Sequence, residues 1–263
     1  MQLESLHIYA VKSAAGINAA RWPVDEFRTV PRRRFVVVDE GGMFRTQRHH
    51  PRLALLRTTL GDAAITLAAP GMQPLSLPLD PAGGRAALVT VWNDTCEARL
   101  CEHAADDWLS RFLGVPSRLA YMPATTLRPL DPERAPPGRR VSFADAYPFL
   151  LIGAASLMDL NRRLAAALPM NRFRPNLVIA GSAPYAEDSW HRIRIGTLEF
   201  DVVKPCARCV ITTTDQDTAE RGVEPLRTLG QYRRFGDDVW FGQNLVHHGT
   251  GELRVGDPVT VLA

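Results

Sequence analysis

The chain has 263 residues, 46% of them hydrophobic and 22% charged, a composition typical of globular proteins that excludes wholesale disorder. Its 31 basic residues nearly balance 28 acidic ones, and the net charge of +3 gives no support for nucleic-acid or membrane-surface binding. No apolar run approaches the roughly 20 residues that span a bilayer, and the amino terminus lacks the pattern of a secretory signal. We therefore expect a cytoplasmic protein that binds neither nucleic acid nor membrane.

Short strands separated by turn residues are predicted over the first hundred residues. They cover residues 2–11, 34–38, 43–47, 53–60, 63–68, 75–79 and 87–92. The turns 39–42 and 61–62 join two pairs of them as hairpins. Regular short strands favour a sandwich or barrel over alternating strand–helix units.

Helices are predicted where the spacing of apolar residues changes. Residues 103–113 and 154–168 place apolar side chains at helical spacing, and Gly114 ends the first run. The stretch 124–140, rich in Pro and Arg, predicts a loop or linker. Further strands are predicted over 177–180, 192–195, 198–203, 210–213 and 259–262. We therefore expect a mostly β fold with a few helices (α+β), in two parts that meet near residue 120.

The motif KPCARC, residues 204–209, carries the strongest chemical signal. Cysteine acts as a nucleophile or metal ligand in its thiolate form, which nearby positive charge favours. Lys204 and Arg208 supply that charge next to Cys206 and Cys209. Lys204 is also one of only two lysines in the chain, with Lys12.

Several interpretations of this motif compete. A redox dithiol would precede a helix, whereas the following Val-Ile-Thr-Thr-Thr favours a strand. A zinc site would need Cys96 and Cys101, which lie over a hundred residues away at an unsuitable spacing. Two interpretations remain: small core residues, or one thiolate on a soft or redox-active metal whose other ligands come from a cofactor.

Basic and polar side chains also stand at the ends of predicted strands. They are Lys12, Ser13, Arg34, Arg48, Arg174 and Asn176. An ammonium, a hydroxyl and several guanidinium groups can together bind a phosphate or a pterin ring. Because arginine is abundant in this chain, each arginine taken alone is equally explained as a solvated surface residue. Asp188, in a loop, either places a carboxylate near a site or caps a turn.

Several blocks along the chain resemble, in order, the MOSC-domain proteins, and among them the branch of the mitochondrial amidoxime-reducing component and its bacterial relatives. The blocks are IYAVKS (8–13), RRRFVVVDEGGMFRTQR (32–48), FADAYPFLLIGAASLMDLNRRL (143–164), NRFRPNLVIAG (171–181), PYAEDSW (184–190), KPCARCVITTTDQDT (204–218) and FGQN…GELRVGDPV (241–259). The resemblance spans nearly the whole chain. It implies an N-terminal β-barrel region over residues 1–120, packed on a MOSC β-barrel domain over residues 121–263.

That family binds a molybdenum pyranopterin cofactor, and the resemblance implies that Cys209, not Cys206, ligates the metal. The other cofactor contacts carry over by position to Lys12, Ser13, Arg34, Ala146, Tyr147, Arg174, Asn176, Ala207, Arg208 and Asn244. Ala146 and Tyr147 stand where the animal branch has a Thr–Ser pair, and Ala207 replaces a frequent serine. The hydroxyl contacts to the pterin are therefore absent or different at these positions.

The resemblance implies reduction of N-hydroxylated compounds, such as hydroxylamines and amidoximes, to the corresponding amine or amidine, with release of water. Asp188 is the expected proton donor. The chain has no further cysteines for an iron–sulfur cluster, so we expect a separate electron-donor protein of ferredoxin or flavoprotein type. The alternative is a module that binds or carries the molybdenum cofactor or sulfur without reductase activity, as at the end of molybdenum-cofactor sulfurases.

Overall fold

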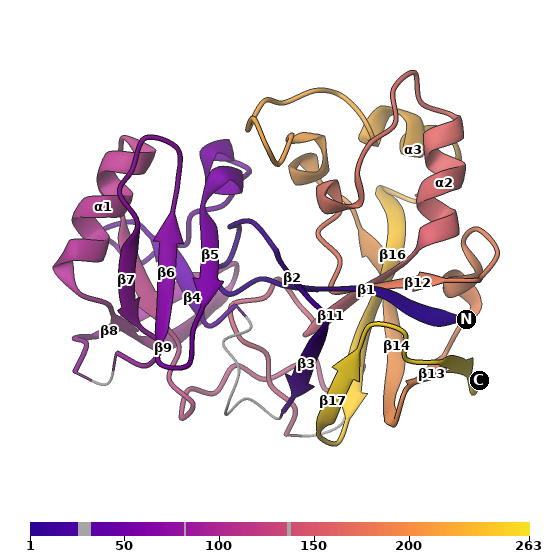
Figure 1. Ribbon diagram of the computed structural model, residues 1–263, viewed down its shortest axis with the longest axis horizontal. Coiled ribbons are helices and arrows are strands. Elements are labelled where there is room, and N and C mark those ends of the chain that lie inside the picture. Colours follow the sequence, from indigo (N-terminus) through magenta and orange to yellow (C-terminus); the bar gives the residue numbers. More distant parts are fainter. Residues whose placement is uncertain (26–32, 82, 136–137) are drawn as a thin grey trace.

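The computed structural model describes residues 1–25, 33–81, 83–135 and 138–263. Residue 32 of the RRRFVVV block and residues 136–137 of the predicted loop 124–140 lie outside this range. The elements form two lobes, one with α1 and β4 to β9 and the other with α2, α3 and β11 to β18 (Figure 1). The expected mostly β fold with a few helices is confirmed.

The first lobe contains two antiparallel sheets, with strand orders β4-β10-β9-β8 and β5-β6-β7. Its elements are β4 (Phe35–Val38), η1 (Pro51–Leu55), β5 (Arg57–Leu60), β6 (Ala64–Ala68), β7 (Leu75–Pro78), β8 (Ala86–Val91), β9 (Asp94–Leu100), α1 (His103–Leu113) and β10 (Arg118–Tyr121). Both faces of β4 are buried: Phe35 and Val37 pack with the apolar face of α1, and Val36 and Val38 pack against β8 and β9. One strand therefore joins two hydrophobic clusters.

The second lobe is built on a sheet of order β18-β13-β14-β16-β11-β12-β1-β2, with β15 paired to β16. Its elements are β1 (Gln2–Ile8), β2 (Ile17–Ala19), β11 (Phe149–Gly153), α2 (Ala154–Arg162), η2 (Met170–Arg172), β12 (Leu177–Ala180), η3 (Ala186–Ser189), β13 (Arg192–Ile195), β14 (Leu198–Ala207), η4 (Val210–Thr213), α3 (Leu226–Tyr232), β15 (Arg234–Phe235), β16 (Asp238–His248) and β18 (Val259–Val261). A separate pair joins β3 (Arg21–Val24) to β17 (Gly251–Arg254).

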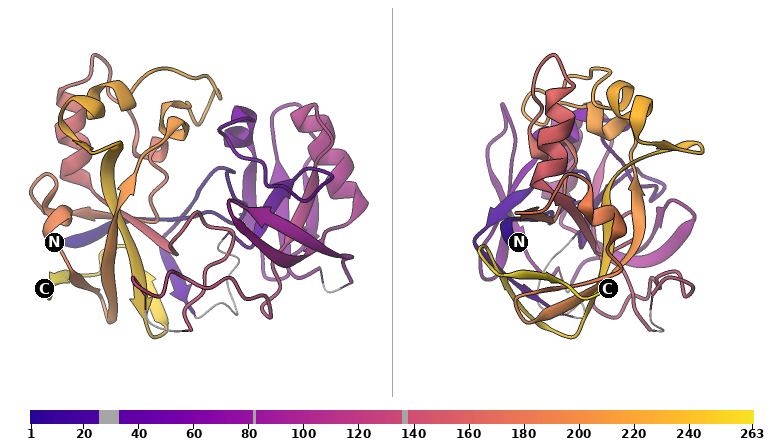
Figure 2. Two further views of the ribbon diagram at one scale, coloured as in Figure 1. Left: turned by 180° about the vertical axis from the view of Figure 1, so that it is seen from behind. Right: turned by 90° about the vertical axis from the view of Figure 1, so that its right-hand side faces the viewer.

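The amino-terminal strands belong to the sheet of the second lobe. β1 pairs antiparallel with β12 and with β2, and its buried Leu3 and Leu6 pack into the core of that lobe. Both chain ends therefore lie on the same lobe (Figures 1 and 2). After β1 the chain enters the junction between the lobes, where Val11 bridges to Phe35 of β4.

The predicted helix over 103–113 and the predicted strands over 177–180 and 192–195 are confirmed. The second predicted helix ends earlier, at Arg162, because the Asn161 side chain binds both backbone groups of Leu168 and closes a loop. The strand predicted over 43–47 is absent, and only single bridges from Met43 and Phe44 occur there.

The strand predicted over 210–213 is wrong, since this segment forms the short 3₁₀ helix η4. The Thr212 and Thr213 hydroxyls donate to the carbonyls of Cys209 and Val210, three residues earlier. Such local side-chain to backbone bonds compete with strand pairing. β-branched residues that favour a strand by propensity are therefore held in a turn.

No helix in the described part of the chain is both long and apolar enough to cross a bilayer. The longest α-helix, α1, has 11 residues and is amphipathic, with its apolar side packed against the first lobe.

Glu187, which is fully buried, stands at the start of α2. Its Oε1 accepts hydrogen bonds from the Gly153 backbone N–H at 3.0 Å and from Ser156 Oγ at 2.7 Å. A carboxylate there satisfies a helix N–H group that lacks an intrahelical partner and complements the helix dipole. Glu187 thereby fixes α2 to the loop before β13.

Gly153 has no room for a side chain beside this carboxylate, since an added Cβ would lie 2.8 Å from Glu187 Oε2 and 3.1 Å from Ser156 Oγ. We expect Gly153→Ala to lower the free energy of unfolding by about 1–3 kcal/mol through overpacking, measured by urea denaturation. Gly222→Ala is the control, because its Cβ would meet no atom closer than Glu224 N at 4.0 Å. Equal losses from the two substitutions would contradict this account.

Candidate functional site at the junction of the lobes

A cavity of about 760 Å³ is lined by residues of both lobes. This volume is in the range of sites that bind cofactors or small molecules. Its walls include Lys12 and Ser13 after β1, Trp92 between β8 and β9, the segment 145–147, and Cys209 beyond β14. Segments far apart in the sequence therefore meet at one place.

Most of the residues expected at a cofactor site line this cavity. They are Lys12, Ser13, Ala146, Tyr147, Arg174, Asn176, Ala207, Arg208, Cys209 and Asn244. Arg34 and Asp188 are not among the lining residues. What the structure supplies here is proximity; the role of each residue stays a prediction.

The cavity walls carry more basic than acidic groups. The basic residues are Lys12, Arg33, Arg48, Arg128, Arg134, Arg174, Lys204 and Arg208, and the acidic residues are Asp94, Asp131 and Asp145. Low-dielectric walls concentrate the field of such a set, so the cavity favours an anionic group. Phosphate suits it well, because guanidinium groups bind phosphate in a bidentate manner.

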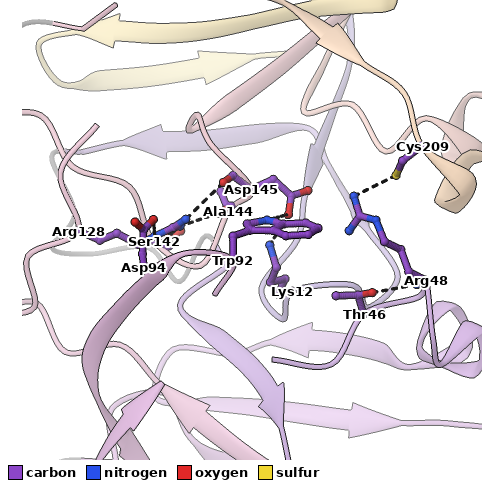
Figure 3. A network of polar contacts seen from close by, with 10 residues as sticks. All are labelled: Lys12, Thr46, Arg48, Trp92, Asp94, Arg128, Ser142, Ala144, Asp145 and Cys209. Atoms are coloured by element: carbon purple, nitrogen blue, oxygen red, sulfur yellow. Dashed lines mark hydrogen bonds and ion pairs between the residues drawn. The ribbon is translucent and has the colours of Figure 1, made fainter. Parts of the chain in front are cut away.

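Lys12 is buried in the cavity wall, with 3% of its surface exposed. Its Nζ donates to Asp145 Oδ1 at 2.6 Å (Figure 3). The same Nζ lies 5.3 Å from the centre of the Phe44 ring. Burial lowers the pKa of Lys12 to about 8, and the nearby Arg33 guanidinium acts in the same direction, whereas Asp145 opposes both. Lys12 is therefore a desolvated cation aimed at the cavity.

Asp145 is the principal counter-charge of this cluster. It also accepts a hydrogen bond from the Trp92 indole N–H at 3.1 Å. Desolvation by the surrounding walls would raise the pKa of Asp145, but the charges of Lys12 and Arg33 outweigh it and hold that pKa below its usual range. Asp145 is therefore a firmly ionised carboxylate.

Arg128 holds the backbone that carries Asp145. Its guanidinium donates to Asp94 Oδ2 at 2.9 Å and to the carbonyls of Ser142 and Ala144 at 2.7 and 2.6 Å. Asp94 starts β9, so Arg128 connects the first lobe to the loop before β11 (Figure 3).

Arg174 is buried with its guanidinium 4.3 Å from the centre of the Tyr9 ring. Burial lowers the pKa of Arg174 to about 10. Its Nη1 has a long contact of 3.4 Å to Gln216 Oε1. The aromatic ring partly replaces the lost hydration of the guanidinium. Because the contact to Gln216 is long, the guanidinium has little hydrogen bonding to described residues to give up when a ligand binds.

The KPCARC segment leaves regular pairing as it enters the cavity. The register between β14 and β16 shifts twice, between Val202 and Lys204 and again between Pro205 and Ala207. Asn244 of β16 donates to the carbonyls of Lys204 and Pro205 at 3.2 and 3.4 Å. β-Bulges of this kind re-aim side chains next to functional sites.

The two cysteines of the motif have different arginine partners. Arg208 Nη1 donates to Cys206 Sγ at 3.0 Å, and Arg208 Nη2 donates to the Phe173 carbonyl at 2.6 Å. Arg48 Nη2, from the first lobe, donates to Cys209 Sγ at 3.1 Å (Figure 3). Each sulfur therefore accepts a charged hydrogen bond.

Backbone strain gathers at the cavity. Four non-glycine residues that line it have positive φ: Ser13 (67°), Arg33 (49°), Trp92 (59°) and Arg174 (56°). In the part of the chain that the structure describes, only Tyr185 and Ala219 share this property elsewhere. Residues held in sparsely populated conformations cluster at functional sites, where the surrounding structure compensates their cost.

An amide pair, Gln47 and Gln216, joins the lobes. Gln47 Nε2 donates to Gln216 Oε1 at 3.1 Å, and Gln216 Nε2 donates to Gln47 Oε1 at 3.0 Å. Both side chains are buried, and Gln47 also donates to the Ser13 carbonyl at 2.7 Å. The pair fixes the segment of Arg48 relative to the loop that follows Cys209.

Two of the expected site residues, Arg34 and Asp188, have protein partners outside the cavity lining. Arg34 is buried in the first lobe, where its Nε donates to the Met122 carbonyl at 2.8 Å and its guanidinium lies over the Tyr121 ring. Asp188 accepts hydrogen bonds from Arg233 at 2.5 Å and Gln243 at 2.8 Å. The cofactor contact expected of Arg34 and the proton-donor role expected of Asp188 therefore stay predictions, and neither side chain lines this cavity.

Four further residues line the cavity, although no sequence pattern predicts a role for them: Arg33, Trp92, Arg128 and Asp145. Asp145 and Arg33 lie within blocks of the family resemblance, and Asp145 is the residue before Ala146. Trp92 and Arg128 lie outside every block. Only the folded arrangement reveals their contact with the site.

Comparison with known proteins identifies two family regions. Residues 138–260 match the MOSC domain, and residues 1–116 match the MOSC N-terminal beta barrel domain. The chain is 36% identical to mitochondrial amidoxime-reducing component 1 of Homo sapiens, over 98% of this chain and 82% of that protein. It is 34% identical to mitochondrial amidoxime reducing component 2 of Rattus norvegicus, over 96% of this chain and 80% of that protein. Molybdenum cofactor sulfurase of Danio rerio is 33% identical over 93% of this chain and 32% of that protein.

The pKa of Lys12 predicts how stability depends on pH. Its folded value of about 8 is below the ordinary 10.5, so the unfolded chain binds more protons between these pH values. The free energy of unfolding of the wild type should therefore rise by roughly 2–3 kcal/mol relative to that of Lys12→Met as pH rises through this window. Urea denaturation at several pH values measures the difference, with Lys204→Met as the matched control at an exposed lysine. A difference that does not change with pH would contradict the burial of a charged lysine.

Proposed function

The chain belongs to the MOSC-domain family, and on that basis we propose that it is a reductase of N-hydroxylated compounds that depends on a molybdenum pyranopterin cofactor. The single observation that supports this most is the approach of Cys209 to a cavity dominated by basic side chains. A sulfur ligand for a soft metal and cations for a phosphate are the two groups that such a cofactor requires.

The residues that line the cavity fit the anionic phosphate of a molybdenum pyranopterin cofactor. Arg208 Nε is buried and has no hydrogen-bond partner among the described residues, and Arg174 has only one long polar contact. Both cations are thus free to donate to an added anion. An anionic ligand would offset the mutual repulsion of Lys12, Arg33 and Arg174.

We propose that Cys209 binds the metal and that Lys12, Ser13, Arg174 and Arg208 hold the phosphate and the pterin. Ala146 and Ala207 offer backbone groups and Tyr147 a phenol at the cavity wall, while Asn176 and Asn244 act as supports. The Asn176 side chain binds the backbone of Leu150 and His7, and Asn244 binds the backbone of the KPCARC segment. When bound, the cofactor would supply the two electrons that convert N–OH to N–H.

The protein's own part is to admit and orient a small substrate and to hold charge around it. Removal of the N–OH oxygen as water requires two protons. We propose that they come from solvent through the cavity mouth, because Asp188 is not among the lining residues and Asp145 is held ionised. Lys12 keeps its proton on Nζ below about pH 8 and neutralises Asp145.

The name of the mitochondrial amidoxime-reducing components indicates a substrate of the N-hydroxylated class. A separate electron-donor protein of ferredoxin or flavoprotein type would supply the electrons. We propose residues 1–120 and 121–263 as the two domains, with β1 and β2 contributed by the first to the sheet of the second. The relatives carry a mitochondrial name, so a cytoplasmic location stays a prediction.

A carrier role is the second candidate, since the molybdenum cofactor sulfurase of Danio rerio matches 93% of this chain. Such a module would bind the molybdenum cofactor or sulfur without turning over an N-hydroxylated substrate. A protein that retains molybdenum and pterin but does not reduce benzamidoxime with a dithionite-type donor would favour this role.

We expect Cys209→Ser to lose at least 100-fold in benzamidoxime turnover and most of its bound molybdenum, because a hydroxyl is a poor ligand for a soft metal. Metal analysis and a turnover assay on the same samples measure the two effects. Cys206→Ser is the matched control and should retain both, since serine still accepts the Arg208 hydrogen bond. Equal losses in the two variants would contradict the assignment of Cys209 as the ligand.

We expect Asp188→Asn to keep its turnover per bound molybdenum, because Asp188 is paired with Arg233 and is not among the residues that line the cavity. Its free energy of unfolding should fall by about 1–3 kcal/mol, since a charged hydrogen bond is lost from a guanidinium that is only 9% exposed. A large loss of turnover at full metal content would instead support the proton-donor role.

A further inference from the structure

Arg48 reaches across the junction of the lobes to the sulfur of Cys209. Its Nη2 lies 3.1 Å from Cys209 Sγ, a short distance for an N–H donor to sulfur. Arg48 belongs to the segment before η1, whereas Cys209 caps η4 of the other lobe. Neither KPCARC nor its neighbours in sequence supply this hydrogen bond.

Trp92 holds the guanidinium in this position. Its ring lies 4.5 Å from Arg48 Cζ, so the guanidinium lies between an aromatic face and the sulfur. The indole N–H donates to Asp145, and the ring meets Phe44 edge-on at 5.0 Å. These contacts compensate the strain of a tryptophan with φ of 59°, at a turn where glycine would be unstrained.

The backbone of Arg48 is fixed as well. Its N–H donates to Thr46 Oγ1 at 2.9 Å, and its carbonyl accepts from Arg221 Nη2 at 2.6 Å (Figure 3 shows the first). Arg221 also binds the Gln47 carbonyl. Backbone, ring and sulfur contacts thus hold a flexible side chain in one geometry, which is how a preorganised donor is built.

We propose that Arg48, held by Trp92, is a positioning residue that tunes the metal through the Cys209 sulfur; this inference rests on the function proposed above. A charged hydrogen bond draws electron density away from a ligating thiolate. Hydrogen bonds to ligand sulfur and outer contacts of this kind tune reduction potentials at sulfur-ligated metals. A thiolate that gives less electron density to the metal stabilises the reduced state of the metal. Loss of the Arg48 hydrogen bond should therefore lower the reduction potential.

The first test measures the positive charge close to the Cys209 sulfur, in protein that contains no metal. The full chain, prepared free of cofactor, reacts at one fixed pH with iodoacetate or iodoacetamide, and mass spectrometry follows Cys209. Both reagents consume thiolate, so the ratio of their rates cancels the ionised fraction and reports local positive charge. Trypsin cuts after Arg208, which separates Cys206 and Cys209 into different peptides.

We expect Arg48→Gln to reduce the iodoacetate-to-iodoacetamide rate ratio at Cys209 several-fold, and Arg48→Lys to keep most of it. Trp92→Gly should give an intermediate loss, because glycine suits the positive φ while the platform under the guanidinium disappears. Arg52→Gln is the matched control, since it removes an exposed arginine four residues later, in η1, that is not among the residues lining the cavity. An unchanged ratio in Arg48→Gln would overturn the proposal.

The second test uses the loaded protein. Redox titration followed by the Mo(V) electron paramagnetic resonance signal should give a lower potential for Arg48→Gln than for wild type, at equal molybdenum content. Arg48→Lys should lie between them, and Arg52→Gln should match the wild type. Equal potentials in wild type and Arg48→Gln would overturn the tuning role while leaving the proposed function intact. A wild type that binds neither molybdenum nor pterin would overturn the proposed function and this inference with it.

Discussion

The pairing of β1 with β12 is the constraint on which the site depends. It fixes residues 2–8 in the sheet of the second lobe, although the chain goes on to build the first lobe. The segment after β1 therefore has to cross the junction, and Lys12 and Ser13 lie on that crossing. Leu3 and Leu6 secure the strand by packing into the second core. Hydrophobic burial at one end thus positions an ammonium group at the other.

Gathering cations in a cavity is unfavourable, and the structure offsets the cost in separate ways. Lys12 has the carboxylate of Asp145, and Arg174 has the face of the Tyr9 ring. Arg128 has four oxygen acceptors, three of them carbonyls of one loop. None of these partners fully neutralises the set. The residual positive field favours an anionic group in the cavity over a cationic one.

The sequence predicts the elements best where local pattern and packing agree. α1 begins and ends as expected, because its apolar spacing and Gly114 point the same way. Local patterns fail at 210–213, where threonine hydroxyls bind the backbone and override strand propensity. At the site, the family motifs name Lys12, Arg174 and Cys209, which line one cavity, while their roles stay predictions. They do not separate Arg34 from its neighbour Arg33, because only the direction of the side chain distinguishes them. Trp92 and Arg128 make their contacts across the junction of the lobes, and the spacing of residues along the sequence does not predict such contacts.

The reciprocal Gln47–Gln216 pair has a consequence for the ageing of this protein. Each amide donates to and accepts from the other, so the match depends on both nitrogens being present. Hydrolysis of either amide to a carboxylate would remove a donor and set a buried negative charge among Ser13, Gln47 and Gln216. Arg174, near Gln216 Oε1, would then be drawn to that charge. Slow deamidation at this one contact would thus weaken the junction between the lobes and draw the Arg174 guanidinium away from the cavity.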